Sequence, residues 1–164
     1  LLVGFSGSWP AGCIFWGWLR AHPALHLPVE AFALPLALGG LQGRWRLAAT
    51  FYLSSLAGTA CTDLAMAATG VMQYWPAVVT ASMDQAPLLL HQAGLHLLQP
   101  LPLATLGIAA ALVLFAGLRL NKKGHGSEAD AGAMAAAVLT TTLWVDGLFL
   151  LAAVLQPGLS GLIE

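Results

Sequence analysis

Residues Phe51–Gly70 read FYLSSLAGTACTDLAMAATG, an apolar stretch whose one charged side chain, Asp63, lies near its far end. A helix of about 20 mostly apolar residues crosses a bilayer, so this stretch is long enough to span one. A carboxylate inside such a span costs at least about 2.5–3.5 kcal/mol on insertion scales. Asp63 should therefore face a partner or a cavity, and we expect the other apolar segments to pack around this helix.

The composition is that of an integral membrane protein. Of the 164 residues, 59% are hydrophobic and 8% are charged, with a mean hydropathy of +0.80. Soluble domains carry about 25% charged residues. The net charge of −1 and the lack of a Lys/Arg cluster exclude a nucleic-acid partner. We predict one all-α membrane domain over residues 1–164, with membrane lipids and other transmembrane subunits as partners. Because residue 1 is Leu rather than Met, we expect further sequence upstream.

The apolar runs predict a helical bundle of about five transmembrane spans. These spans are expected at residues 2–19, 28–42, 47–70, 103–120 and 131–155. The second span is short and contains Pro35, so it should be tilted, kinked or partly re-entrant. Residues 84–99 predict a moderately amphipathic helix that lies on the membrane surface.

The distribution of cations predicts the orientation. With five spans, connectors 43–46 and 121–130 share one side of the membrane. Five of the six Lys and Arg residues lie at or beside them: Arg44, Arg46, Arg119, Lys122 and Lys123. The positive-inside rule assigns this side to the cytoplasm, which places connectors 20–28 and 71–102 on the far, lumenal or periplasmic side.

Two intramembrane carboxylates, Asp63 and Asp146, are each preceded by a threonine four residues earlier, Thr59 and Thr142. This spacing puts each pair on one helix face. The carboxylates could hold a proton or cation, as in membrane carriers. The more common alternative is structural: each Asp caps a helix, bonds a hydroxyl or pairs with Arg20.

Several histidines and one glutamate are candidate ligands on the far side of the membrane. They are His22, His26, Glu30, His91 and His96. Imidazole is an axial ligand for a tetrapyrrole and a metal ligand. For each histidine alone, ordinary interfacial hydrogen bonding is the simpler interpretation. Neither H-E-x-x-H nor C-x-x-C occurs, so we predict no catalytic residues and assign no metal site. Cys13 and Cys61 lie in apolar runs and are expected to be buried.

Small residues recur at four-residue spacing, as in Gly58 with Thr62, Gly107 with Ala111 and Gly132 with Ala136. Such pairs allow helix backbones to approach closely in lipid. They favour a compact bundle or docking onto other helices.

Three segments, GWLRAHPALHLPVEAFALPLAL, FYLSSLAGTACTDL and VDGLFLLAA, together resemble a family of cyanobacterial multi-helix membrane proteins known as a domain of unknown function. The likeness covers most of residues 16–63 and 142–153, roughly half of the chain, and does not extend to residues 71–132. The family brings no established activity. The resemblance implies an oxygenic phototroph, and hence a thylakoid or plasma membrane.

These features lead to two main functional hypotheses. The first is a non-enzymatic accessory or assembly subunit of a photosynthetic thylakoid complex, associated with a photosystem and a candidate binder of chlorophyll a or carotenoid. The second is a small proton- or cation-coupled transporter that uses Asp63, Asp146 and Glu30. An intramembrane enzyme acting on lipid or pigment is the least favoured.

Overall fold

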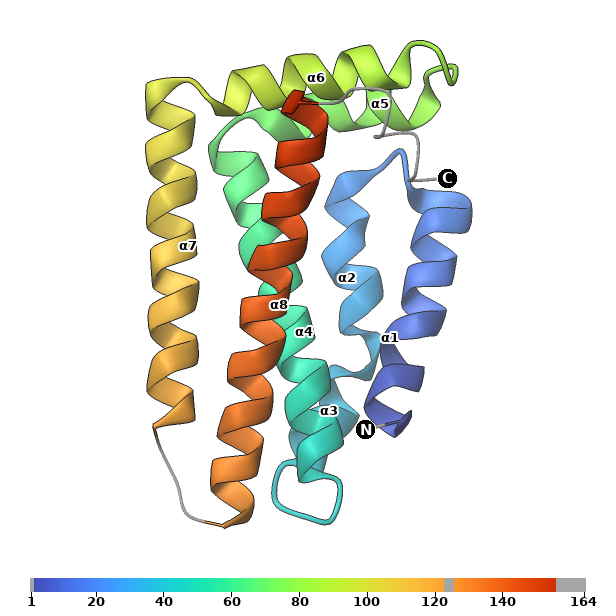
Figure 1. Ribbon diagram of the computed structural model, residues 1–164. Helices are drawn as coiled ribbons and strands as arrows, with labels where there is room; N and C mark the ends of the chain where they lie inside the picture. Colours follow the sequence, from blue (N-terminus) through green and yellow to red (C-terminus); the bar gives the residue numbers. More distant parts are fainter. Residues whose placement is uncertain (1, 123–125, 156–164) are drawn as a thin grey trace.

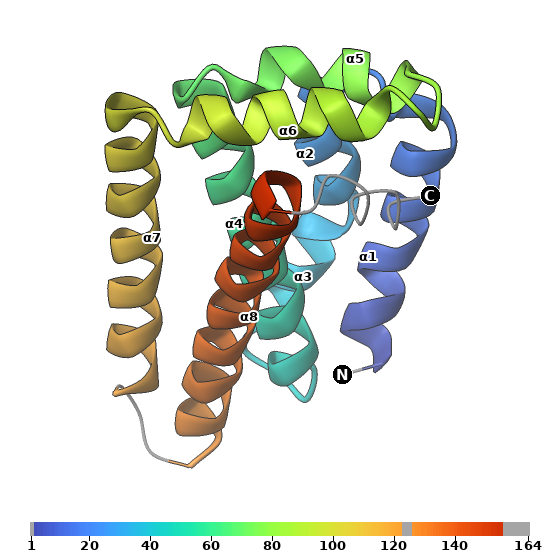
Figure 2. The same cartoon turned by 45° about the horizontal axis from the view of Figure 1, so that its top comes forward.

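The computed structural model describes residues 2–122 and 126–155, and every regular element within these ranges is a helix. The all-α prediction is therefore confirmed for the described residues. In Figure 1, long helical segments stand side by side, and α6 (Ala86–Leu97) crosses over one end of them. Figure 2 shows α5 and α6 together over that end.

The N-terminal half consists of short helical pieces followed by one long helix. Helix α1 (Leu2–Ile14) continues as a π-helical turn, η1 (Phe15–Leu19). The next pieces are η2 (Pro23–Leu25), α2 (His26–Glu30), η3 (Ala31–Ala33) and α3 (Leu34–Gly40). Helix α4 (Arg46–Ala68) then runs through the bundle, and Gly70 ends it with a φ of 74°, a left-handed conformation that favours glycine.

The C-terminal half contains the longer apolar helices. It begins with η4 (Val71–Tyr74) and α5 (Trp75–Thr80), which are followed by α6 (Ala86–Leu97), α7 (Pro100–Asn121) and α8 (Ser127–Leu155). Helix α4 packs against α1 and α8, while α8 also packs against α7 and α6. Helix α8 is thus central to this half.

The break between α2 and α3 occurs where the sequence predicts a kink. Pro35 lies in the first turn of α3, where its missing N–H leaves no intrahelical bond to lose. The Tyr52 hydroxyl of α4 donates to the Glu30 carbonyl and accepts from the Ala33 amide at 3.2 Å. Because one buried side chain satisfies both backbone groups, the broken segment is fixed against α4.

The prediction of five membrane spans is wrong on length and hydropathy. Among the described residues, two helices are long and apolar enough to cross a bilayer: α7, and Glu128–Leu155 within α8. Segment 2–19 contains Pro10 and changes to π-helical geometry, and segment 28–42 is divided into three short pieces. Helix α4 has the length, but its serines, threonines, Tyr52 and Asp63 lower its hydropathy.

Few large side chains are buried, although most of the chain is apolar. Phe15 is the largest fully buried side chain among the described residues. Leu101 and Ile108 on α7 and Trp144 on α8 are exposed by 78%, 63% and 67%. Cys13 and Cys61, which were expected to be buried, are both exposed.

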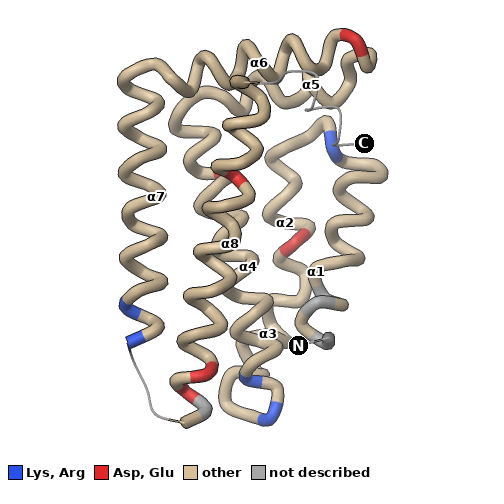
Figure 3. Tube along the Cα trace, viewed as in Figure 1, with Lys and Arg blue, Asp and Glu red and all other residues tan. Residues whose placement is uncertain are grey.

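Basic residues concentrate at the end of the bundle opposite α6, as the blue segments of Figure 3 show. Arg44 lies in the turn between α3 and α4, Arg46 begins α4, and Arg119 and Lys122 lie at the end of α7. Lys123 lies outside the described residues. Arg20 precedes η2, at the end covered by α5 and α6.

Candidate functional site

A cavity of about 560 Å³ lies among α4, α6, α7, α8 and the segment around η1 and α5. Its wall is mostly apolar. The polar side chains that line it include His26, Thr62, Asp63, Thr69, Thr142 and Asp146. Ligand sites in proteins typically have this size and this combination of an apolar wall with a few polar groups. Two of the carboxylates singled out in the sequence therefore line one cavity.

His26 lies between two carboxylates. Its Nδ1 is 3.3 Å from Asp63 Oδ1, and its Nε2 is 3.4 Å from Glu30 Oε1. Glu30 is one helical turn ahead on the same face of α2, whereas Asp63 comes from α4. The Phe15 ring stacks on the imidazole at 4.3 Å between centroids, which limits its access to water. A protonated His26 would pair with both acids.

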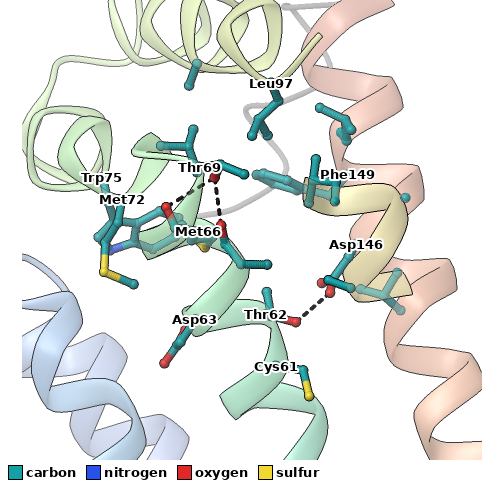
Figure 4. A pocket seen from close by; sticks show the side chains of 18 of the residues that line it. Cys61, Thr62, Asp63, Met66, Thr69, Met72, Trp75, Leu97, Asp146 and Phe149 are labelled. Atoms are coloured by element: carbon teal, nitrogen blue, oxygen red, sulfur yellow. Dashed lines mark hydrogen bonds between the residues drawn. The ribbon is translucent and has the colours of Figure 1, made fainter. Parts of the chain in front are cut away.

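Asp146 is held differently. Its Oδ2 accepts a hydrogen bond of 2.7 Å from the Thr62 hydroxyl of α4. Within the described part of the chain, no Lys, Arg or His side chain forms an ion pair with Asp146. Figure 4 shows Thr62 and Asp146 facing each other across the gap from α4 to α8, while Asp63 points toward the other side of α4. Asp146 is thus a half-buried carboxylate without a cationic partner.

The two threonines expected to share a face with these acids contact other groups. The Thr59 hydroxyl forms a hydrogen bond with the Glu30 carboxylate rather than with Asp63. The Thr142 hydroxyl donates to the Val138 carbonyl of its own helix at 3.2 Å and faces Gly58. Thr62, which the sequence analysis paired only with Gly58, provides the bond to Asp146.

The remaining predicted histidines do not join this cluster. His91 Nδ1 is 3.0 Å from the Ala153 carbonyl, and His96 Nε2 is 2.8 Å from the Thr69 carbonyl. Both bonds fasten α6 to the ends of α8 and α4. His22 is exposed in the connector before η2. Of the five candidate ligands, the structure brings together only His26 and Glu30. Within the described ranges, no group of three or more His, Cys, Asp or Glu side chains is arranged to hold a metal ion.

Comparison with known proteins places the chain in a family. A family model described as "Protein of unknown function (DUF3120)" matches residues 1–154. The chain belongs to this family. No curated protein and no solved structure matches the chain. The resemblance to a domain of unknown function is therefore confirmed, and it extends through the middle of the chain, where sequence reading found no likeness. A cyanobacterial origin stays a prediction.

Sequence reasoning missed the aromatic part of the cavity wall. Trp16 and Trp75 both line the cavity, with ring centroids 5.7 Å apart. The Trp75 indole also donates to the Arg20 carbonyl at 2.8 Å, which joins η1 to α5. The sequence pattern around each tryptophan could not predict that the two rings meet, because the two residues are far apart in the chain.

Proposed function

We propose that the chain is a membrane carrier that couples movement of a small solute through its cavity to protons. The membrane setting is supported by exposure as well as composition. Only 11% of the apolar stretch of each long helix is buried. An apolar helix in the core of a soluble protein would be mostly buried, whereas lipid accepts an exposed apolar face.

The observation that carries the proposal is the placement of Asp146. It faces a largely apolar cavity with one hydroxyl as its partner. A carboxylate in such surroundings is stabilised by taking up a proton or by binding a cation. Asp146 can therefore change between a protonated state and a cation-bound state as a solute enters and leaves.

The cluster of His26, Glu30 and Asp63 supplies a second group of exchangeable protons. Asp63 and His26 both line the cavity, and the charge of Asp63 acts on Asp146. A proton gained at one carboxylate lowers the repulsion felt by the other. This coupling supports proton exchange between the two acids, with His26 as the neighbouring donor.

The second candidate is the accessory or assembly subunit of a photosynthetic thylakoid complex that binds chlorophyll or carotenoid. Its support is the apolar cavity and the presence of His26 in its wall. We rank it below the carrier because both ring nitrogens of His26 already have carboxylate neighbours, at 3.3 and 3.4 Å. His91 and His96 likewise bond backbone carbonyls. An absorption spectrum of protein purified from its native membrane tests this candidate directly: pigment bands that disappear in His26→Leu would favour it.

Proton movement in proteoliposomes tests the carrier. Liposomes containing the protein and internal pyranine, with the membrane potential clamped by potassium and valinomycin, receive pulses of sodium chloride, tetrapropylammonium chloride or sodium glutamate. We expect at least one pulse to change the internal pH faster than in protein-free liposomes. Asp63→Asn and Asp146→Asn should remove that change.

Asp84→Asn is the matched control, since Asp84 is an exposed carboxylate outside the cavity. It should leave the pH change intact. Equal pH changes in wild type, Asp146→Asn and protein-free liposomes would contradict the carrier function.

A further inference from the structure

Aromatic side chains line the cavity together with its carboxylates. Trp16, Trp75 and Phe149 all line the same cavity as Asp146. Phe149 is three residues beyond Asp146 on α8, so the two share a helix face. Trp16 and Phe149 are exposed by 42% and 37%, which leaves ring surface free to contact a solute. Aromatic faces attract cations through the quadrupole of the ring.

The charges of the cavity also favour a cation. Two carboxylates, Asp63 and Asp146, line the cavity together with one imidazole, His26. Because Glu30 and Asp63 both neighbour this imidazole, their cluster remains net negative even when His26 is protonated. The basic residues at the opposite end of the bundle do not line the cavity. An anionic solute would meet net repulsion here, because His26 already lies between two carboxylates and no Lys or Arg lines the cavity.

The wall chemistry separates organic from inorganic cations. Small inorganic cations such as Ca²⁺ or Mg²⁺ take six or more oxygen ligands. Around Asp146 the described residues offer the carboxylate and the Thr62 hydroxyl, and beyond them mainly carbon. A cation that carries its own apolar groups needs one counter-charge and an apolar, aromatic wall.

We infer that the cavity binds a lipophilic organic cation, with Asp146 as its counter-ion and the rings of Trp16, Trp75 and Phe149 against its apolar groups. The inference rests on the proposed carrier function and names the class of its solute. Binding of one monovalent cation at Asp146 displaces one proton from that carboxyl group. Affinity should therefore fall as the pH is lowered.

Binding of tetraphenylphosphonium to the protein in lipid nanodiscs, measured by equilibrium dialysis without any gradient, tests the inference. Empty nanodiscs correct for partition into lipid. Tetraphenylborate has the same shape and the opposite charge, so it controls for simple hydrophobic binding. We expect saturable binding of the cation alone, weakened at least tenfold by Asp146→Asn and unchanged by Asp84→Asn.

Phe149→Leu provides a second variant in case Asp146→Asn does not fold. It keeps apolar bulk but removes the ring, and we expect severalfold weaker binding. Binding of the cation with full affinity to Asp146→Asn or Phe149→Leu, or equal binding of tetraphenylborate, would overturn the inference. Solute-driven proton movement without cation binding would overturn it too while leaving the carrier function standing. Asp146-dependent cation binding without proton movement would instead count against the carrier.

Discussion

At the scale of the residue, Gly58 allows α4 to lie against α8 at Thr142. A Cβ atom at position 58 would be 2.8 Å from Thr142 Oγ1 and 3.2 Å from Cγ2. The β-branched Thr142 has few rotamers in a helix, and turning away would break the bond from its hydroxyl to the Val138 carbonyl. We expect Gly58→Ala to separate the helices and to lower the free energy of unfolding by about 1–3 kcal/mol. Thermal unfolding in detergent micelles measures the loss.

Two further variants show whether the close contact is the cause. Gly107 on α7 has no atom within 4 Å of its would-be Cβ, so Gly107→Ala should cost nothing and gain up to about 1 kcal/mol of helix stability. Adding Thr142→Ala to Gly58→Ala should recover part of the lost stability. A double variant no more stable than Gly58→Ala alone would show that the contact does not limit packing.

His26 is expected to stabilise the fold through its two carboxylate neighbours. Removing the imidazole with His26→Ala leaves Asp63 and Glu30, each about one-fifth exposed, without this partner. The loss should be about 1–3 kcal/mol, the cost of leaving a buried polar group unsatisfied. His22→Ala, four residues earlier in an exposed position, is the matched control and should change stability by less than about 0.5 kcal/mol. Equal unfolding temperatures for the two variants would argue against the cluster.

The sequence could predict that Asp63 needs a partner but not which one. A lone carboxylate in an apolar run is a local signal with a large energetic consequence. The partner, His26, lies 37 residues away, beyond two prolines and a chain reversal. The same limit applies to Asp146, whose partner Thr62 is 84 residues distant. Contacts of this kind depend on which face of each helix points toward its neighbour. A uniformly apolar helix has no periodic pattern of polar residues from which that face could be predicted.

At the scale of the element, α6 is attached to the bundle by two histidines and one close contact. His91 and His96 bond carbonyls of α8 and of the end of α4, and Gly94 lies against Val154. We expect His96→Ala to loosen one end of α6, because the Thr69 carbonyl loses its partner. Hydrogen–deuterium exchange should increase over residues 86–97 and stay unchanged in α7.

Gln92→Ala is the control for this element, since Gln92 is exposed on α6. It should leave exchange over the helix near the wild-type rate. Faster exchange that spreads equally through α4, α7 and α8 in His96→Ala would mean that the histidine supports the whole bundle rather than the attachment of α6.

The long helices were predictable from sequence because their apolar runs are uninterrupted. Residues 103–120 and 131–155 lie within α7 and α8, and residues 84–99 enclose α6. The short pieces η4 and α5 were missed, since they lie in a stretch that was read as a polar connector. Prolines predicted that the segment of α2 and α3 would be irregular. They could not predict that the Tyr52 hydroxyl would provide hydrogen bonds to the backbone groups freed at the break.

At the scale of the whole molecule, the arrangement of charge predicts which end faces the cytoplasm. The turn between α3 and α4, which contains Gly43, lies at the basic end, whereas the connector between α5 and α6, which contains Ser82, lies at the opposite end (Figure 1). Both residues are exposed, and a side chain at Gly43 would meet no atom within 4 Å. With Cys13 and Cys61 replaced by alanine, Gly43→Cys and Ser82→Cys can each report one side of the membrane.

In intact bacterial cells expressing the protein, a membrane-impermeant maleimide should label the cysteine of Ser82→Cys and not that of Gly43→Cys, because the basic end is retained inside. Opening the cells should expose both thiols equally. Labelling of Gly43→Cys alone would reverse the orientation, and labelling of both in intact cells would show that the chain does not separate the two ends across a membrane.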